Sequence, residues 1–207
     1  MGTNYKALLI SKLFIFALIC LSACERIPRL PPLASDAVIL AFGDSLTYGT
    51  GAESNESYPV ELQRMIGRKI INKGVPGELS AEGLRRLPGV LDEVKPQLLI
   101  LCHGGNDLLR KTGEAATADN LRAMIKIAKE RGIGVVMIAV PKPGFSLSPP
   151  EYYESVAKEN GIPIEVNILS VVLKDNGLKS DLIHPNAKGY ALLANAIARL
   201  LEKAKAI

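Results

Sequence analysis

The stretch Ala37-Val38-Ile39-Leu40-Ala41-Phe42-Gly43-Asp44-Ser45-Leu46 decides the fold that we expect for this chain. Residues 37–42 form an unbroken apolar run of about the length of one strand, and the Gly-Asp-Ser that follows is typical of a turn. A continuous apolar run indicates a strand that is covered on both faces, as in a parallel sheet between helices. Ser45 therefore falls where a buried strand ends, which is where such sheets bind their ligands.

The rest of the chain alternates between strand-like and helix-like stretches. Apolar runs predict strands at residues 38–42, 69–72, 98–102, 135–140 and 164–166. Apolar residues at helical spacing predict helices at residues 58–66, 81–91, 116–131, 152–160 and 186–203. This alternation favours an α/β fold with a parallel five-stranded sheet covered by helices on both faces, in one domain over residues 37–207.

Two later segments carry side chains that could react together with Ser45. The first, Gly104-Gly105-Asn106-Asp107, follows a predicted strand, and the second, Asp181-Leu182-Ile183-His184-Pro185, precedes the last predicted helix. A serine hydroxyl becomes a good nucleophile when an imidazole within about 3 Å takes its proton, and an acceptor must hold that imidazole in the right tautomer. The backbone N–H of Ser45 and the side chain of Asn106 are candidate donors to the oxyanion that forms.

Each of these segments alone has an ordinary interpretation. Gly-Asp-Ser is a common turn, Gly-Gly-Asn-Asp could be a flexible turn with a helix cap, and Asp-x-x-His-Pro could be a surface loop. The conjunction is stronger, because the chain holds only two histidines, His103 and His184, from which a base could come. His103 has no carboxylate directly beside it in the sequence, so we expect it to be a packed or turn residue.

The residues around Ser45 fit two other motifs less well, a nucleophile elbow and a phosphate-binding loop. Thr47 occupies the position of the final glycine of a G-x-S-x-G nucleophile elbow. Gly43, Gly49 and Gly51 lie close together, but no Lys-Ser or Lys-Thr follows them as a phosphate-binding loop requires.

Together with the glycine of Val75-Pro76-Gly77-Glu78, these segments resemble the four sequence blocks of the SGNH, or GDSL, hydrolase family. The resemblance covers nearly all of the chain after residue 36. Residues 77–88 make it most similar to the bacterial group of thioesterase I, arylesterase and lysophospholipase. Two departures stand out: the second block reads Pro-Gly-Glu where Ser-Gly-Asp is common, and Cys102-His103 precedes Gly104.

The resemblance implies a three-layer, flavodoxin-like fold and a role for each matching residue. It makes Ser45 the nucleophile, His184 the base and Asp181 the residue that orients the base. Gly77 N–H and the Asn106 side chain would join Ser45 N–H as oxyanion donors. The reaction would need neither a cofactor nor a metal ion.

Two loops at the carboxyl end of the expected sheet could shape a substrate pocket. They span residues 108–113 and 141–150, and their apolar side chains could line a groove for an acyl chain: Leu108, Leu109, Phe145 and Leu147. Isolated exposed hydrophobic residues are also ordinary, so the groove is one of two interpretations.

The amino terminus predicts export. Lys6 and Lys12 precede the apolar run of residues 13–21, which is shorter than the roughly 20 residues of a membrane span, and small residues follow it. Leu21-Ser22-Ala23-Cys24 resembles the bacterial lipobox, which implies a signal peptide over residues 1–23 and lipid on Cys24. The protein would then be anchored in the bacterial cell envelope, facing the periplasm or the exterior. The alternatives are an uncleaved anchor, or secretion with Cys24 free.

The prolines, the net charge and the cysteines limit which partners and cross-links we expect. Residues 24–36, with Pro28, Pro31 and Pro32, are typical of a spacer. The formal net charge of +4 includes the two signal-peptide lysines, so we expect no nucleic-acid partner. With Cys20 in the signal and Cys24 acylated, only Cys102 is left, so neither an internal disulfide nor a zinc site is expected. The sequence does not indicate an oligomeric state.

The leading hypothesis is a membrane-tethered serine esterase whose substrate is a small acyl ester, thioester or lipid. An O-acetyl esterase of cell-wall or capsular polysaccharide could use the same residues, because the triad serves any small acyl group. A non-catalytic binding lipoprotein is the alternative from another class of protein. The intact set of Ser45, Gly77, Asn106, Asp181 and His184 argues against it.

Overall fold

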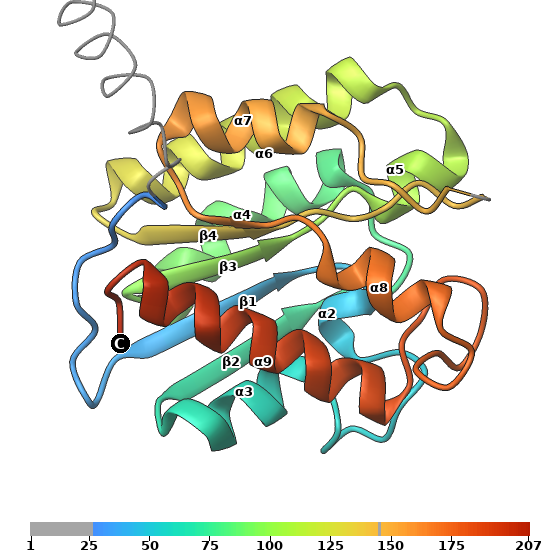
Figure 1. Cartoon of the computed structure of the whole chain (residues 1–207). Coiled ribbons are helices and arrows are strands. Elements are labelled where there is room, and N and C mark those ends of the chain that lie inside the picture. Colours follow the sequence, from blue (N-terminus) through green and yellow to red (C-terminus); the bar gives the residue numbers. More distant parts are fainter. Residues whose placement is uncertain (1–26, 145) are drawn as a thin grey trace, which may run out of the picture.

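The computed structural model describes residues 27–144 and 146–207. The predicted signal peptide, Cys24 and Phe145 therefore lie outside the described residues. Within the described part, a parallel sheet is sandwiched between two layers of helices, as Figure 1 shows. No helix of this part is both long enough and apolar enough to span a membrane.

The sheet contains five parallel strands in the order β2-β1-β3-β4-β5. Their bounds are Val38–Gly43 (β1), Lys69–Gly74 (β2), Leu98–Cys102 (β3), Gly134–Ile138 (β4) and Ile164–Glu165 (β5). The central strands β1 and β3 are buried along almost their whole length, as their unbroken apolar runs predict. The predicted five-stranded parallel sheet and α/β fold are confirmed.

Helices cover both faces of this sheet. On one face α3 packs on α9, which also contacts α8, and on the other face α4 packs on α6, which contacts α7. Their bounds are Tyr58–Ile66 (α3), Ser80–Val94 (α4), Glu114–Glu130 (α6), Tyr152–Asn160 (α7), Ile168–Lys174 (α8) and Ala187–Lys203 (α9). The five predicted helices are all present, with ends that differ by up to three residues.

Three short helices were absent from the sequence prediction. They are α2 (Ser45–Tyr48), α5 (Gly105–Arg110) and α8. Each is too short to show a clear helical period, and α2 and α5 begin inside glycine-containing turns. All three carry residues of the candidate site, and α2 and α5 carry Ser45 and Asn106.

The strand order places that site. The chain moves outward in opposite directions from β1 and β3, to β2 on one side and to β4 on the other. The segments that leave the carboxyl ends of β1 and β3 therefore separate and open a crevice between them, which is the ligand-binding position of open α/β sheets. Helices α2 and α5 begin at this crevice.

The amino-terminal segment lies at the other end of the sheet. The backbone N–H of Leu30 donates to the carbonyl of Ala204 (2.9 Å), and that of Leu33 donates to Ala206 (2.8 Å). Leu30 is buried and reaches Gly134, the first residue of β4. The predicted spacer is thus described from residue 27 onward, and there it is fastened to the domain beyond the end of α9.

Candidate active site

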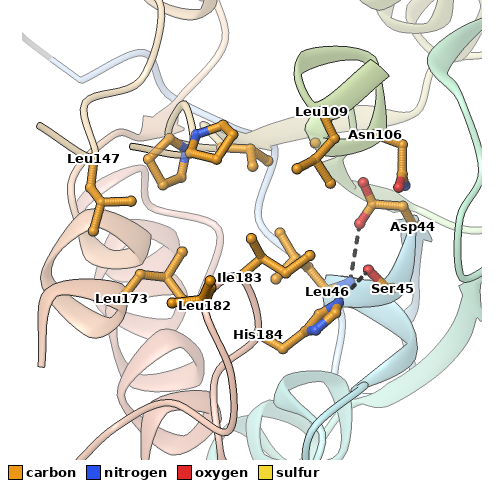
Figure 2. Close-up of a pocket in the computed structure, with 14 residues that line it drawn as sticks. Asp44, Ser45, Leu46, Asn106, Leu109, Leu147, Leu173, Leu182, Ile183 and His184 are labelled. Carbon is orange, nitrogen blue, oxygen red and sulfur yellow. Dashed lines mark hydrogen bonds between the residues drawn. The ribbon is translucent and has the colours of Figure 1, made fainter. Parts of the chain in front are cut away.

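A line of hydrogen bonds joins Ser45, His184 and Asp181. Ser45 Oγ lies 3.0 Å from His184 Nε2 (Figure 2), and His184 Nδ1 lies 2.7 Å from Asp181 Oδ2. A carboxylate only accepts, so the proton of a neutral imidazole sits on Nδ1 and leaves Nε2 free to accept from the serine hydroxyl. The structure therefore brings together the three residues that the sequence analysis expected to react together.

Asp181 also shapes the loop that carries His184. Its Oδ1 accepts from the backbone N–H groups of Ile183 and His184, each at 2.8 Å. Burial opposes ionisation, but the hydrogen bonds from the His184 ring and these two N–H groups outweigh it and lower the pKa of Asp181. The group is therefore an anion at neutral pH, as an orienting residue must be.

The same loop is closed by backbone contacts. Ser180 N–H donates to the carbonyl of His184 (3.0 Å), and Asn186 N–H donates to that of Leu178 (2.9 Å). The Asn186 side chain then caps α9 by accepting from Gly189 N–H at 3.1 Å. The His184 imidazole is thus held by a hydrogen-bonded loop between α8 and α9.

The predicted oxyanion donors lie across the pocket from this loop. Asn106, on α5, donates from Nδ2 to the carbonyl of Glu78 (3.0 Å). An amide nitrogen carries two hydrogens, so this bond leaves one N–H for a substrate in the pocket that Asn106 lines. Gly77 is the neighbour of Glu78 in the chain, so the predicted donors Gly77 and Asn106 are brought together by this contact.

Buried polar contacts tie these two segments more firmly. Asp107 is 4 % exposed and accepts from both Ser80 N–H (2.8 Å) and Ser80 Oγ (2.7 Å). Asn120 donates to Ser80 Oγ at 2.9 Å. Ser80 is the first residue of α4, so these bonds join α5 to the segment that contains Gly77. Sequence reasoning did not single out Ser80.

Asp44 is buried and caps the helix that begins with Ser45. Its Oδ1 accepts from Leu46 N–H at 3.0 Å. Burial raises the pKa of Asp44, and the nearby imidazoles of His103 and His184 oppose that rise. The Gly-Asp-Ser segment therefore forms a turn, as expected, and the Asp44 cap in this turn fixes Ser45 at the start of α2.

His103 is fully buried, in agreement with its interpretation as a packed residue. The structure adds a carboxylate that the neighbouring sequence did not show, because His103 Nε2 lies 3.0 Å from Oε2 of Glu78. Glu78 is also paired with Arg86, whose Nη2 donates to the same oxygen at 2.7 Å. Gly104, with φ of 104°, makes room for Tyr153, since a Cβ there would lie 2.6 Å from Tyr153 Oη, which donates to the carbonyl of His103 at 2.8 Å.

An apolar pocket extends from Ser45 and His184. The polar residues gather at one end of it and Leu147, Leu173 and Leu182 lie toward the other (Figure 2). Of the predicted groove residues, Leu109 and Leu147 line this pocket, while Leu108 lines an adjacent hollow next to α6. Pro141 and Pro143 of the expected 141–150 loop also line it, and sequence reasoning missed several lining residues from other segments: Leu46, Val140, Leu173, Leu182 and Ile183.

Leu182 and Ile183 could have been recognised from their place between Asp181 and His184, since they must travel with those residues. Leu173 lies on α8, the helix without a clear period, and carried no such signal.

The part of the chain that the structure describes offers no metal site, and its free thiol is not a nucleophile. No group of three or more His, Cys, Asp or Glu side chains there could hold a metal ion. Cys102 is a free thiol buried at the end of β3, and burial raises its pKa well above the ordinary value. It is therefore neither exposed nor ionised enough to attack a substrate.

Comparison with known proteins yields a consistent set of relatives. The model of the GDSL-like Lipase/Acylhydrolase family matches residues 41–192. The chain is 31 % identical over 149 residues to Esterase TesA of Pseudomonas aeruginosa, covering 68 % of this chain and 72 % of that protein. It is 30 % identical over 195 residues to the Arylesterase of Vibrio mimicus, covering 89 % of this chain and 94 % of that protein.

The fold has solved counterparts as well. A crystal structure of TesA superposes with a TM-score of 0.73 at 27 % sequence identity, covering 81 % of this chain and 99 % of that one.

Proposed function

Because the chain belongs to the GDSL-like lipase/acylhydrolase family of ester-cleaving hydrolases, we propose that Ser45, His184 and Asp181 are its catalytic triad. The observation that carries this proposal is the unbroken line from Ser45 Oγ to His184 Nε2 (3.0 Å) and from His184 Nδ1 to Asp181 (2.7 Å). Both distances are short enough for direct proton transfer or tight orientation without a rearrangement.

In the first half of the reaction, Ser45 Oγ attacks the acyl carbonyl carbon while His184 Nε2 takes the hydroxyl proton. Asp181, kept anionic by its hydrogen bonds, stabilises the imidazolium that forms. When the tetrahedral intermediate collapses, the imidazolium gives its proton to the departing alcohol or thiol. The acyl group is then bonded to Ser45 Oγ.

In the second half, a water molecule replaces the alcohol. His184 takes a proton from this water, which attacks the acyl carbonyl and releases the carboxylic acid. The proton then returns from His184 to Ser45 Oγ, so that the enzyme is regenerated and the net reaction consumes one water per ester.

Three N–H groups stabilise the negative charge on the substrate oxygen in both halves. They are the second N–H of the Asn106 amide and the backbone N–H groups of Gly77 and Ser45. Because the segments of Asn106 and Gly77 are already tied together, through Asn106 to Glu78 and through Asp107 to Ser80, these two donors need little reorganisation when the charge develops.

The acyl group of the substrate occupies the apolar pocket, with its chain pointing from Ser45 toward Leu147 and Leu173. Its lining favours short-to-medium acyl esters over acetate, and the resemblance at residues 77–88 adds thioesters to the expected range.

A fluorophosphonate probe tests the whole proposal. The wild-type protein should be labelled at Ser45, and Ser45→Ala should be neither labelled nor active while its thermal unfolding stays close to that of the wild type. A wild-type protein that resists labelling would instead support a binding lipoprotein that does not turn over.

The proposal extends to location: Cys24 carries lipid that ties the enzyme to the cell envelope. Its support is the sequence alone, the charged and apolar segments and the lipobox-like Leu21-Ser22-Ala23-Cys24. Radiolabelled palmitate should enter the wild type and not Cys24→Ser, and esterase activity should be equal in the two. Equal labelling of both proteins would rule out lipid at Cys24.

A further inference from the structure

The two places where the sequence departs from the blocks of its family lie in contact with each other. Glu78 replaces the aspartate common after the glycine of the second block, and His103 directly precedes the glycines of the third. Although 25 residues separate them in the sequence, His103 Nε2 lies 3.0 Å from Glu78 Oε2. Both side chains are buried, with exposed fractions of 0 % and 6 %.

The hydrogen bonds of His103 define its role. Gly104 N–H donates to Nδ1 at 3.1 Å, so in the neutral ring the proton is on Nε2, which donates to Glu78. Both ring nitrogens are thereby occupied within the protein, and the ring is fully buried. His103 cannot exchange a proton with a substrate in the pocket.

Arg86 completes the group by balancing the charge of Glu78. Its guanidinium donates to the Glu78 carboxylate and to the carbonyl of Lys73 (2.9 Å), and it lies 3.9 Å from the centre of the Phe42 ring. Burial alone would raise the pKa of Glu78, but the hydrogen bonds from His103 and Arg86 lower it. The carboxylate is thus held from two sides by donors on α4 and at the end of β3.

The backbone of Glu78 is connected directly to both proposed oxyanion donors, Gly77 and Asn106. The backbone carbonyl of Glu78 accepts from Asn106 Nδ2 at 3.0 Å, and its amide follows directly on Gly77. Any displacement of the Glu78 backbone therefore moves Gly77 N–H and Asn106 together. A change of about 1 Å in such groups can reduce the rate roughly a hundredfold.

Helix α4 packs closely against the pair. A Cβ on Gly83 of α4 would lie 2.4 Å from His103 Nε2 and 3.3 Å from Glu78 Oε2. The helix can approach the pair only because glycine occupies this position, so α4, the end of β3 and the Gly77 segment are fitted to one another here.

We propose that His103, Glu78 and Arg86 are positioning residues that hold Gly77 and Asn106 in the geometry needed to bind the oxyanion. This assignment rests on the proposed function, because it concerns the same site. It also gives the two departures from the family blocks one joint explanation, since each supplies the hydrogen-bonding partner of the other.

Steady-state kinetics with p-nitrophenyl butyrate test the assignment through His103→Leu and His103→Gln. The leucine variant should lower kcat about tenfold or more and leave KM within about twofold, because the lost contact matters when charge develops on the oxygen. Glutamine can direct an amide N–H toward Glu78, so it should restore part of kcat. A merely structural role would show neither the kcat-specific effect nor the rescue.

A double-mutant cycle shows whether the effect passes through Asn106. If it does, His103→Leu should cost clearly less kcat in an Asn106→Ala background than in the wild type. The cycle is repeated with Arg86→Gln, whose side chain is partly exposed and better tolerated, in case His103→Leu does not fold. Arg85→Gln, a change at the exposed neighbouring position on α4, is the matched control and should leave kcat unchanged.

The possible failures are distinguishable. A wild type without esterase activity or probe labelling would overturn the proposed function and this assignment with it. An active, labelled wild type in which His103→Leu and Arg86→Gln keep full kcat would overturn the assignment alone. Equal losses in both backgrounds of the cycle, or a raised KM at constant kcat, would also overturn it.

Discussion

The molecule contains two acid–histidine pairs that differ in their exposure to solvent and in what the second ring nitrogen of the histidine contacts. In the open pair, His184 and Asp181 are 2.7 Å apart, Asp181 is half exposed, and His184 Nε2 contacts a serine hydroxyl. In the closed pair, His103 and Glu78 are 3.0 Å apart and buried, and His103 Nδ1 accepts from a backbone N–H. A carboxylate–histidine pair can therefore act as a base when one ring nitrogen faces a reacting atom, as in His184. When both ring nitrogens are hydrogen-bonded within the protein, as in His103, the pair can only hold other residues in position.

The largest expected effect separates the two histidines. His184→Ala should lower kcat/KM by roughly 10⁴- to 10⁶-fold, because the serine loses its base. His103→Ala should be mild by comparison, about tenfold, because it disturbs the position of two donors but removes no reacting group. Kinetics on p-nitrophenyl butyrate measure both, with thermal unfolding as the control for folding. The reverse ranking would make His103 the base.

The next effect concerns Asn106, which lies between the two pairs. Asn106→Ala should lower kcat by roughly 10²- to 10³-fold, because it removes a donor to the developing oxyanion. KM should change little, since the ground-state carbonyl gains less from that bond than the transition state does. If KM rises while kcat stays the same, Asn106 binds substrate and does not stabilise the transition state.

The pH dependence of the free energy of unfolding should differ between the buried carboxylate of Glu78 and the half-exposed carboxylate of Asp181. The pKa of Glu78 in the folded protein lies below its ordinary value of 4.5, so ionised Glu78 stabilises the fold above that pH. This contribution is lost as the pH falls through the lowered pKa. Glu78→Gln should therefore reduce the free energy of unfolding at pH 7, by about 1 to 3 kcal/mol for a buried charged hydrogen-bonding group, and the deficit should shrink below about pH 4.5.

Asp181→Asn is the matched variant for the open pair. The pKa of Asp181 is also lowered, but its side chain is half exposed and its interactions are screened by solvent. Urea unfolding between pH 3 and 7 should show a smaller stability change for Asp181→Asn than for Glu78→Gln. If Asp181→Asn changes the free energy of unfolding as much as Glu78→Gln or more, then solvent exposure does not determine how much each carboxylate stabilises the fold.

The smallest effect for a single change is that of one methylene of the acyl chain, which should depend on the pocket beside His184 and not on the buried pair. Each methylene that leaves water gains about 0.8 kcal/mol, or roughly fourfold in kcat/KM, so octanoate should be preferred to butyrate until the groove ends. Leu109→Ala, in the pocket, should reduce this preference, whereas His103→Leu should leave the ratio unchanged. Good turnover of acetyl esters with almost none of octanoyl esters would favour the polysaccharide O-acetyl esterase.

The fold was largely predictable because its main elements are long enough to show a pattern. The strands at Val38–Gly43 and Leu98–Cys102 are continuous apolar runs, and the helices at Glu114–Glu130 and Ala187–Lys203 show apolar residues at helical spacing. The short helices α2, α5 and α8 were missed because fewer than eight residues cannot establish a period.

The candidate site was predictable from the sequence where chemistry restricts the residue type. Ser45, Asn106 and His184 could be chosen because few side chains can serve as nucleophile, oxyanion donor and base, and because β1 and β3 end at the same edge of the sheet. The contact between His103 and Glu78 could not be predicted. It depends on how the segment after β2 folds back over the end of β3, which local sequence does not encode.

The attachment of residues 27–33 beside the carboxyl end of α9 has a consequence for which molecules can reach Ser45. Leu30 packs at the end of the sheet where β4 begins, whereas the pocket lies at the opposite end. A lipid on Cys24 would therefore hold the domain with its pocket turned away from the bilayer in which the lipid is inserted. Such an enzyme would meet esters that diffuse to it, or that lie on a surface facing its own membrane, in preference to the lipids surrounding its anchor.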